Sequence, residues 1–568
     1  MGHFTDNLLC FGDNLDFLRN DELLPSASVD LIYLDPPFNS QQNYNILFKE
    51  ASGTPEAAQI KAFEDTWKWD MAANTALTAI HTDPAVPAPL VDLTKTFMGF
   101  LKASPMMAYL VQMAIRLVHM HRVLKPTGSL YLHCDPTASH YLKIVLDAIF
   151  GPTRFLNEIV WKRTSAHSDA KQGRMGFGNV TDIILFYSKS SELTFHAAHL
   201  PYEESYLSSK YRHTDADGRL YRLDNLTGPG GASKGNPSYE VMGVVRHWRY
   251  SKQRMEQLIA DGRVIQTRPG AVPQYKRYLD EMAGRPAQNL WDDVNPINSQ
   301  AQERMGYPTQ KPIELLKRIV AASSNPGDVV FDPFCGCGTT IDAVETLNRE
   351  TPDLPQRKWI GIDITHLSIN LIKHRLTRFT PPPRYQVIGE PTSTSGAAAL
   401  AAQDAYQFQF WALGLIGARP VGGAKKKGAD RGIDGVVFFQ DEIVNGMPAT
   451  KKMLVQVKSG HVKSGDIRDL VGTVSREEAQ MAAFITLEEP TSAMKSEAAT
   501  AGMYQSPGWN KPYPRVQILT IEQLLADPYR PHPRCLAIPD RLTQHTLPAA
   551  PKHKSKSAAQ ATLGFEQP

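Results

Sequence analysis

The stretch DVVFDPFCGCGTT, residues 328–340, decides which fold the chain adopts. Its apolar start is typical of a buried strand, and Asp332 marks the point where that strand ends. Gly336 and Gly338 then precede a helical segment that begins near Thr339. Two glycines let the backbone approach a ligand closely, and a helix N-terminus offers free N–H groups. The stretch therefore predicts a strand, a glycine-rich turn and a helix, with a ligand held at the turn.

Two features of the sequence indicate which ligand the turn binds: the absence of a phosphate-loop lysine and the acid on the strand that follows. No lysine follows the second glycine, and the chain contains no phosphate-loop motif anywhere. The next strand, KWIGIDI over residues 358–364, carries Asp363 near its end. An acid at that position on a neighbouring strand can bind both hydroxyls of a ribose. Together these features indicate an adenosine-bearing cofactor without a pyrophosphate, which points to S-adenosylmethionine.

Strand-like and helix-like segments alternate on both sides of a long central region. We expect buried strands over residues 29–35 and 128–135, and a helix over 140–151 that ends at a glycine. Beyond residue 300, an amphipathic helix over 312–324 precedes the strand of the glycine turn. This alternation predicts an α/β fold with a doubly wound sheet.

Length and composition exclude several classes of protein. A chain of 568 residues is too long for one core and predicts several domains. With 61 Lys+Arg against 58 Asp+Glu, the overall charge says little about partners, so a nucleic-acid site must come from local basic clusters. Five scattered cysteines argue against a disulfide framework. No signal peptide and no membrane-spanning run is evident, so we expect a cytoplasmic protein without a membrane partner.

The segment DLIYLDPPFN, residues 30–39, ends a good strand in an unusual way. Two consecutive prolines remove two backbone donors and fix two φ angles. Either this is a stiff turn with an incidental acid, or the rigid backbone holds Asp35 and Phe38 for a chemical task. The segment by itself leaves both interpretations open.

Three separated motifs resemble those of the DNA amino-methyltransferases, which modify adenine N6 or cytosine N4. They are DPPF at 35–38, FDPFCGCGTT at 331–340 and YPTQKPIELLKRI at 307–319. DPPF precedes the glycine element, and this permuted order is similar to the β class, which includes modification subunits of restriction–modification systems. The resemblance covers about residues 5–380. It implies a doubly wound S-adenosylmethionine-dependent methyltransferase sheet with an inserted target-recognition region.

The resemblance also implies which residues hold the cofactor. Asp363 would bind the ribose, and Asp13 would lie near the adenine. Lys311 would neutralise the methionine carboxylate. The methionine side of the pocket would be lined by Asp332, Phe334, Gly336, Gly338 and Thr339, with Thr309, Gln310 and Pro312 completing it.

By the same resemblance, DPPF is the catalytic element and acts on a base flipped out of the duplex. The exocyclic amine is a poor nucleophile because its lone pair is delocalised into the ring. Asp35 and the carbonyl of Pro36 could accept its two N–H bonds, held in place by the rigid turn that Pro37 completes, while Phe38 stacks on the base. Asp at the first position of the motif favours adenine N6 over cytosine N4.

Residues 156–300 would form the target-recognition region on double-stranded DNA. Basic and aromatic residues interleave there without a helical period, which is typical of nucleic-acid surfaces but also of an irregular β-rich insert with solvated charges. The candidate contacts, mostly to phosphate, are Lys162, Arg163, Arg174, Arg246, Arg249 and Lys252.

A second group of candidate site residues lies in the C-terminal region. Asp434 precedes a strand, and the next strand carries Gln456 and Lys458. Metal-dependent phosphodiesterases use such an acid to bind Mg²⁺ and such a lysine to activate water. The region resembles the Mrr-type branch of the PD-(D/E)xK nucleases, but it has Gln456 where an acid is usual. Asp404 could supply a further carboxylate. Cleavage with Mg²⁺ and a non-cleaving DNA- or partner-binding module therefore both remain open.

We accordingly expect a site-specific DNA adenine-N6 methyltransferase of a restriction–modification or defence system with a restriction-endonuclease-like α/β domain fused to it. The alternative is a methyltransferase, acting on adenine N6 or cytosine N4, whose C-terminal domain does not cleave. A restriction subunit and a second copy of the chain are the candidate protein partners. The expected domains are the catalytic half (1–155), the target-recognition region (156–300), the cofactor half (301–380), a linker (381–402), the nuclease-like domain (403–535) and a disordered basic tail (536–568).

Overall fold

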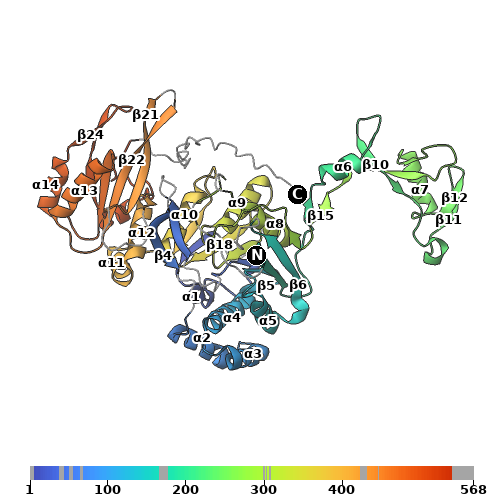
Figure 1. Ribbon diagram of the computed structural model, residues 1–568, viewed down its shortest axis with the longest axis horizontal. Coiled ribbons are helices and arrows are strands. Elements are labelled where there is room, and N and C mark those ends of the chain that lie inside the picture. Colours follow the sequence, from blue (N-terminus) through green and yellow to red (C-terminus); the bar gives the residue numbers. More distant parts are fainter. Residues whose placement is uncertain are drawn as a thin grey trace, which may run out of the picture. The chain divides into compact units, whose positions relative to one another are not determined.

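The computed structural model in Figure 1 describes most of the chain. The structure describes residues 6–37, 68–164, 177–298, 301, 303–305, 307, 309–421, 432–444 and 447–539. It describes the backbone alone for residues 44–49, 55–63, 443–444 and 447–448. Phe38, Arg174 and the expected tail from residue 540 onward lie outside this set. The chain divides into two compact units. Unit 2 comprises residues 196–288, and unit 1 comprises the chain before and after it.

A nine-stranded sheet forms the centre of unit 1. Every neighbouring pair in it is parallel except those that include β7, which runs antiparallel to β5 and β6. In spatial order the strands are β16 (Leu290–Trp291), β6 (Phe155–Lys162), β7 (Thr181–Ser188), β5 (Leu124–Cys134), β2 (Val29–Leu34), β17 (Val329–Asp332), β18 (Lys358–Asp363), β1 (Asn7–Phe11) and β19 (Tyr385–Ile388).

The parallel register of this sheet brings distant parts of the sequence together. Leu31 and Ile32 of β2 pair with Val330 and Phe331 of β17, about three hundred residues further along the chain. On its other edge β17 pairs with β18, which in turn pairs with β1. The carboxyl ends of β2, β17, β18 and β1 therefore meet at one edge of the sheet.

Helices cover both faces of the sheet, as Figure 1 shows. One face packs against α1 (Asn14–Leu18), α2 (Met71–Thr82), α3 (Ala88–Leu101), α4 (Pro105–Val123) and α5 (Ser139–Phe150). The other packs against α8 (Ile313–Ser323), α9 (Thr339–Glu350) and α10 (His366–Leu376). Residues of β2 alternate between the two cores: Ile32 and Leu34 point to the first, Leu31 and Tyr33 to the second. The prediction of a doubly wound α/β sheet is confirmed.

The C-terminal part of unit 1 has its own five-stranded mixed sheet. Its strands are β20 (Arg419–Pro420), β21 (Gly435–Val444), β22 (Met447–Lys458), β23 (Met481–Thr486) and β26 (Val516–Thr520), in that order. On one face lie α11 (Thr394–Gln403), α12 (Ala405–Leu415) and α15 (Ile521–Ala526), and on the other lie α13 (Ser464–Arg476) and α14 (Ser492–Thr500). A hairpin of β24 (Met503–Ser506) and β25 (Lys511–Pro514) accompanies this sheet.

Unit 2 is smaller and mostly antiparallel. It contains α6 (Glu204–Lys210), α7 (Lys252–Ala260) and a four-stranded sheet of β13 (Val264–Ile265), β14 (Gln274–Tyr278), β10 (Leu220–Asn225) and β9 (His213–Thr214). It also has two antiparallel strand pairs: the hairpin of β11 (Ser238–Val241) and β12 (Val244–His247), and the pair of β8 (His199–Leu200) with β15 (Arg285–Pro286). Its core surrounds the fully buried Trp248, whose indole N–H donates to the Tyr239 carbonyl at 2.7 Å.

Two stretches of unit 1 form regular structure outside the elements expected from the sequence. Between β2 and α4 the chain forms the hairpin β3 (Tyr44–Lys49) and β4 (Pro55–Phe63), followed by α2 and α3. The expected linker over 381–402 instead contains β19, which extends the central sheet by pairing with β1, and most of α11. Its many small residues do not prevent order, because Ala397 and Leu400 pack into the C-terminal core.

We predict that Trp248→Ala destabilises unit 2 by about 3–5 kcal/mol, because it removes the largest side chain of a small core. Differential scanning calorimetry of the full chain should show the transition of unit 2 shifted down and that of unit 1 unmoved. Trp509→Ala, at a residue 57% exposed, is the matched control and should move neither transition. A common shift of both transitions after Trp248→Ala would show that the two units unfold as one.

Candidate functional site

Four carboxylates stand at the carboxyl edge of the central sheet. Asp332 and Asp363 are the last residues of β17 and β18, Asp35 directly follows β2, and Asp13 lies just beyond β1. In open α/β sheets, ligands bind outside the carboxyl ends of the strands. The topology thus brings to one edge four of the residues that sequence analysis singled out separately.

Asp332 is buried and fastens the glycine turn to the helix behind it. Its Oδ2 accepts a hydrogen bond from the Thr340 hydroxyl at 2.5 Å, and its Oδ1 accepts one from the Phe334 N–H at 3.1 Å. Burial raises the pKa of this carboxyl to about 7, and the nearby carboxylates of Asp35 and Asp363 add to the rise. Thr340 was not identified from the sequence, although a hydroxyl in the first turn of the helix is a recognisable partner for such an acid.

Asp363 ties the same turn to the start of α10. Its Oδ2 accepts the Gly336 N–H at 3.0 Å, and its Oδ1 accepts both the N–H and the hydroxyl of Thr365 at 2.9 Å. Its backbone carbonyl accepts the Gly12 N–H at 3.0 Å, which fixes the end of β1. Burial raises the pKa of the Asp363 carboxyl to about 6.

The two glycines of the turn adopt backbone angles that favour glycine, and Gly338 also allows close packing. Both have positive φ, +50° for Gly336 and +77° for Gly338. A Cβ on Gly338 would lie 2.6 Å from the Ile372 side chain of α10, so glycine is required there for close packing. Gly338 also precedes Thr339, the first residue of α9, whose helix N-terminus points toward the turn.

Asp13 is committed to a structural role at the other end of this edge. Its side chain accepts the Leu15 N–H at 2.9 Å, which caps α1, and it pairs with the buried Arg116 at 2.7 Å. Arg116 also donates to Asn14 at 2.6 Å. The contact of Asp13 with a cofactor adenine stays a prediction, and the ion pair with Arg116 was not foreseen because α4 lies a hundred residues away.

Asp35 and Lys311 form an ion pair in which both side chains are largely buried, with exposed fractions of 16% and 11%. Pro36 is buried and Pro37 is partly buried, so the turn is fixed by packing as well as by its rings. In the structure, the ammonium group of Lys311 thus contacts the carboxylate of the DPPF motif. Its expected role as counter-ion of a methionine carboxylate stays a prediction.

The loop that delivers Lys311 is braced by side-chain hydrogen bonds. Gln310 accepts the Met305 N–H at 2.7 Å and donates to the Glu303 carbonyl at 2.5 Å. The Glu303 carboxylate in turn accepts the N–H of Ile313, the first residue of α8, at 3.1 Å. Gln310 therefore shapes the loop, and Pro312 ends it as the residue before α8.

A buried polar relay beside Asp35 was not foreseen from the sequence. The hydroxyl of Tyr33 lies 2.9 Å from Nδ1 of His133, and Nε2 of His133 lies 3.1 Å from Asp182. Despite the opposing effect of burial, the pKa of Asp182 is lowered, chiefly by His133 and further by the charges of Lys311 and Arg163. The relay joins the strand of DPPF to β5 and β7. Only the strand order, which the sequence does not display, could have revealed it.

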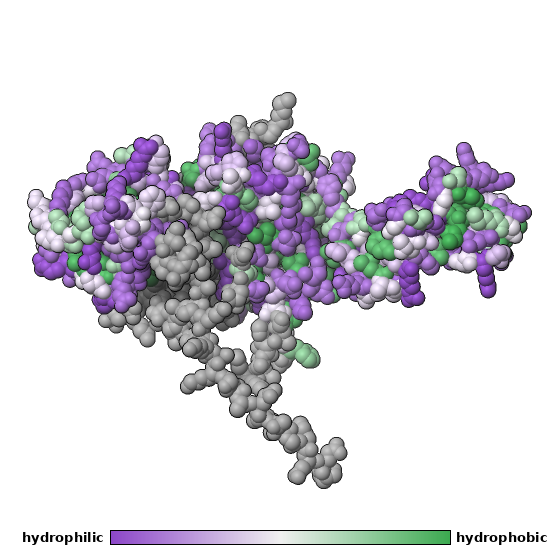
Figure 2. Space-filling view, turned by 90° about the horizontal axis from the view of Figure 1, so that it is seen from above, coloured by the Kyte–Doolittle hydropathy of each residue, from purple (hydrophilic) through white to green (hydrophobic). Residues whose placement is uncertain are grey.

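The candidate DNA contacts fall in both units. Lys162 and Arg163 are exposed at the end of β6, and Arg163 lies 3.4 Å from Asp182. In unit 2, Arg246 and Lys252 are exposed, while Arg249 is exposed but donates to the Thr227 carbonyl at 3.1 Å. Apolar side chains are exposed on unit 2 as well, as the green patches of Figure 2 show. They include Met242 and Val245 of the β11–β12 hairpin.

The C-terminal candidates lie together on adjacent strands. Gly435 pairs with Val455 in the antiparallel β21–β22 register, which places Asp434 opposite Gln456, with Lys458 two residues further along the same strand face. The Asp434 carboxylate accepts the Val457 N–H at 2.7 Å. Among the described residues, no group of three His, Cys, Asp or Glu side chains is arranged to hold a metal ion. Asp404 caps α12 by accepting the Tyr406 N–H at 2.8 Å, which accounts for its presence.

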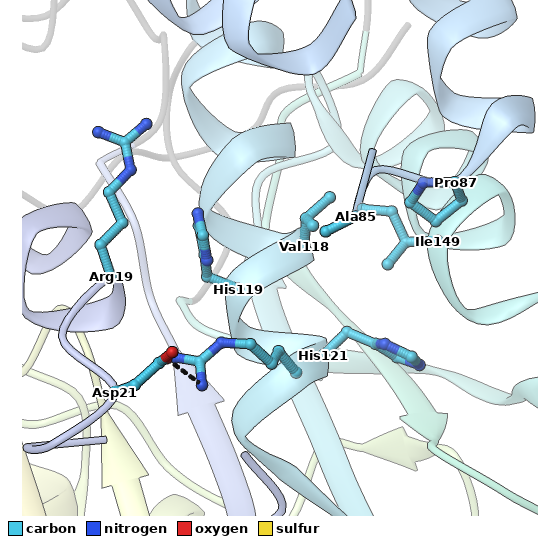
Figure 3. A pocket seen from close by; sticks show the side chains of 9 residues that line it. Arg19, Asp21, Ala85, Pro87, Val118, His119, His121 and Ile149 are labelled. Atoms are coloured by element: carbon cyan, nitrogen blue, oxygen red, sulfur yellow. Dashed lines mark ion pairs between the residues drawn. The ribbon is translucent and has the colours of Figure 1, made fainter. Parts of the chain in front are cut away.

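A pocket of about 380 Å³ lies away from this edge (Figure 3). It is lined near the C-terminal end of α4 by His119 and His121, and by Arg122, which pairs with Asp21 at 2.7 Å. Because α4 leads into the amino end of β5, the pocket lies at the opposite edge of the sheet from the four carboxylates. Burial, reinforced by Lys189, lowers the pKa of His121 to about 4, so this ring is neutral at pH 7.

A doubly wound sheet with a glycine turn, a ribose-type acid and an adjacent Asp-Pro-Pro turn defines the class of S-adenosylmethionine-dependent methyltransferase folds. Residues 29–374 match the sequence model of the N6_N4_Mtase family, described as DNA methylase. This match covers more than half of the chain, and the chain belongs to that family. The resemblance inferred from the motifs is confirmed. Residues 421–526 match a second model, described as NACHT-associated inactive Restriction Endonuclease 1, which confirms the endonuclease-like region.

Similar proteins include restriction–modification methyltransferases. The type II methyltransferase M.EcaI of Enterobacter cloacae is 34% identical over 259 residues, which cover 45% of this chain and 54% of M.EcaI. The Mod subunit of the type III restriction–modification enzyme StyLTI of Salmonella typhimurium is 29% identical over 375 residues, 63% of this chain and 52% of that protein. The chain thus spans about half the length of these two relatives. The DNA adenine methyltransferase YhdJ of Escherichia coli is 44% identical over 88 residues, 16% of this chain and 27% of YhdJ.

Solved structures align only loosely. A DNA modification methylase of Thermus thermophilus complexed with S-adenosyl-L-methionine covers 68% of this chain and 100% of its own, at 16% identity and a TM-score of 0.32. The cytosine-N4-specific PvuII DNA methyltransferase covers 65% of this chain and 86% of its own, at 14% identity and a TM-score of 0.31. The fold assignment therefore rests on the strand order and the family match. Within the described residues, no helix has the length and hydropathy needed to cross a membrane.

The raised pKa of Asp332 predicts a stability effect with a definite sign. A carboxyl whose pKa rises from 3.8 unfolded to about 7 folded is protonated preferentially in the native state. Its contribution to stability therefore falls as the pH rises from about 4 to about 7, and is constant above that. We expect Asp332→Asn, which mimics the protonated form, to raise the midpoint of thermal unfolding of unit 1 at pH 8 and to raise it less at pH 5.

Thermal melts of wild type and variant at both pH values measure this difference. Asp92→Asn, at an exposed site on α3, is the control and should show the same small effect at both. An Asp332→Asn variant that is less stable than wild type at pH 8 would mean that the carboxylate is needed ionised in the folded protein.

Proposed function

We propose that this protein transfers the methyl group of S-adenosylmethionine to the exocyclic amine of a base in double-stranded DNA, and that the base is adenine. The observation that carries the proposal is the pairing of β2 with β17, which sets the Asp-Pro-Pro turn beside the glycine turn. A cofactor held at one turn and an amine held at the other would then be neighbours.

The residues present fit the cofactor. Asp363 closes a strand next to the glycine turn, and Ile364 beside it is 48% exposed, which offers an apolar surface to a purine. The glycine turn and the N-terminus of α9 present N–H groups to a carboxylate. When bound, S-adenosylmethionine would supply a methyl group activated by its sulfonium. Asp332 and Phe334 on the turn, with Thr339 behind it, are the residues that we assign to its methionine side.

Asp35 and the Pro36 carbonyl would bind the target amine. Two acceptors in a fixed geometry can take both N–H bonds of the amine, which favours a pyramidal nitrogen with its lone pair free for the methyl group. Because Lys311 already supplies a positive charge to Asp35, the carboxylate is held in place before the base arrives. The ion pair must open or be shared when the amine binds. Phe38, which follows the turn, is the proposed stacking surface for the flipped base.

Double-stranded DNA is the proposed substrate, and unit 2 is the proposed core of the target-recognition region over 156–300. The support is the set of exposed arginines and lysines on unit 2 and at the end of β6. The proposed methyltransferase domain consists of two halves, residues 1–155 and 301–380, one on each side of this region in the sequence. A restriction subunit is a candidate partner, because the StyLTI relative is itself described as a Mod subunit.

Adenine is favoured over cytosine as the target base. The first residue of the Asp-Pro-Pro-Phe motif is an acid, and the YhdJ relative is described as a DNA adenine methyltransferase. Single-molecule sequencing of DNA from a methylation-free host that expresses the protein would report base, position and recognition sequence together. N4-methylcytosine in that DNA would overturn the choice of adenine.

We predict that Asp35→Ala lowers the rate of methyl transfer by about two orders of magnitude or more, because a preorganised acceptor of the amine is lost. Binding of S-adenosylmethionine should be nearly unchanged. Asp35→Asn keeps the shape and one acceptor oxygen but removes the negative charge beside Lys311, so it separates loss of charge from loss of packing, and Asp92→Ala on the surface is the control. Cofactor binding that falls as much as activity would mean that Asp35 is structural.

The C-terminal module is proposed to be a non-cleaving domain that binds DNA or a partner. Its matched family is described as inactive, and Gln456 stands where an acid would supply the second negative charge for Mg²⁺. The Oε1 atom of Gln456 is buried and accepts no hydrogen bond from the described residues. The fold of a nuclease is therefore kept while its metal-binding charge is reduced. The expectation of Mg²⁺-dependent cutting gives way to this alternative.

We predict that the purified full chain leaves supercoiled plasmid intact in Mg²⁺, and that Lys458→Ala behaves identically. The physical reason is that one carboxylate, already bonded to a backbone N–H, holds a divalent ion weakly. Gel analysis over hours, with a known nuclease as positive control, is the measurement. Nicking by wild type that disappears in Lys458→Ala would restore the catalytic assignment.

A further inference from the structure

Helix α12 of the C-terminal module packs on α10, the helix that follows the strand of Asp363. The approach is close: a Cβ on Gly414 of α12 would lie 2.1 Å from the Asn370 side chain of α10. Asn370 in turn donates to the Phe410 carbonyl at 2.6 Å. These contacts are those of a packed interior, and they join the module to the central sheet at the cofactor edge.

Gln407 of α12 makes the contact nearest the cofactor edge. Its Oε1 accepts the N–H of His366, the first residue of α10, at 2.9 Å. The first N–H groups of a helix have no partner within the helix, and burial makes such a partner necessary. His366 is fully buried and its ring stacks on Phe11 of β1, with 3.5 Å between ring centroids. Thr365 caps α10 by accepting the Ser368 N–H at 3.2 Å, and the C-terminal module supplies the partner of the His366 N–H beside it.

The capped turn is the one that holds the ribose-type acid. Thr365 precedes His366 and donates both its N–H and its hydroxyl to Asp363 at 2.9 Å. Asp363 accepts the Gly336 N–H of the glycine turn at 3.0 Å. An unbroken series of bonded neighbours therefore runs from Gln407 through His366, Thr365 and Asp363 to the glycine turn.

A second contact reaches the same place by packing. Phe410 of α12 forms a small apolar cluster with Leu367 of α10, and Tyr307 packs against it. The Tyr307 hydroxyl lies 3.4 Å from the Ser368 hydroxyl, and a Cβ on Gly336 would lie 3.4 Å from the Tyr307 ring. Tyr307 belongs to the motif that also carries Lys311. The module is therefore connected to the glycine turn in two indirect ways, by hydrogen bonds through α10 and by packing through Tyr307.

From these contacts we infer that the C-terminal module is a structural part of the cofactor pocket, and that Gln407 is a positioning residue for S-adenosylmethionine binding. This inference rests on the proposed function of the pocket. Gln407 acts through the N-terminus of α10, which holds Thr365 and Asp363 in place, and it contacts neither substrate nor cofactor itself. By linkage, cofactor binding must stabilise the docking of α12 as much as docking favours the cofactor.

The test replaces Gln407 by Met in the full chain, which keeps the length of the side chain and removes the acceptor. We expect the dissociation constant for S-adenosylmethionine, measured by isothermal titration calorimetry, to rise about five- to twentyfold. In methylation assays the KM for the cofactor should rise while the KM for DNA is unchanged. Gln403→Met, at an exposed residue at the end of α11, is the matched control and should bind as wild type does.

Hydrogen exchange of the wild type gives an independent readout that needs no variant. S-adenosylmethionine should slow amide exchange in α12 as well as in the glycine turn. Wild type that binds no cofactor at all would overturn the proposed function. Wild type that binds, with equal affinity in Gln407→Met and no protection of α12, would overturn this inference alone.

Discussion

The parallel pairing of β2 with β17 is the constraint on which the rest of unit 1 depends. It joins strands about three hundred residues apart in sequence, and it aligns Leu31 with Val330 and Ile32 with Phe331. A slip of one residue would turn the side chains of β2 to the wrong core and move the Asp-Pro-Pro turn away from the glycine turn. Because both strands are buried on both faces, the two hydrophobic cores that fix the fold also fix the distance between the two turns.

That arrangement places acids where charge is costly. Asp332 is buried and Asp363 is partly buried at the strand ends, and burial raises the pKa of each. The fold offsets part of this cost with hydroxyl and backbone donors, from Thr340 and Thr365 among others. Neutral side chains of similar size would pack at these positions with a smaller desolvation cost, so stability alone does not favour the acids. Acids retained in unfavourable surroundings are therefore better explained by a ligand than by the fold.

The parts of this protein that are determined by local sequence pattern could be predicted from the sequence. The glycine turn, the strand before it, the helix after it and the acid on the next strand all follow from one short stretch of the chain, residues 328–364. The long-range polar contacts could not be predicted, because each joins elements that only the strand order makes neighbours. These contacts are the Asp13–Arg116 pair, the Asp35–Lys311 pair and the Tyr33–His133–Asp182 relay. The same holds for β19 and α11. They lie in a stretch rich in proline and small residues, and their order comes from the pairing of β19 with β1 and the packing of α11 on α12.

The two faces of the C-terminal sheet explain how a nuclease fold can persist without nuclease chemistry. Val455 and Val457 of β22 point to the core that includes α12, whereas Leu454 points to the opposite core. Because side chains alternate along a strand, Gln456 and Lys458 point to the same face as Leu454. These candidate catalytic residues and helix α12 therefore lie on opposite faces of one sheet. A change from acid to glutamine on one face leaves α12 and its contact with α10 intact. The contact of Gln407 with the first N–H of α10 therefore does not depend on the charge at position 456.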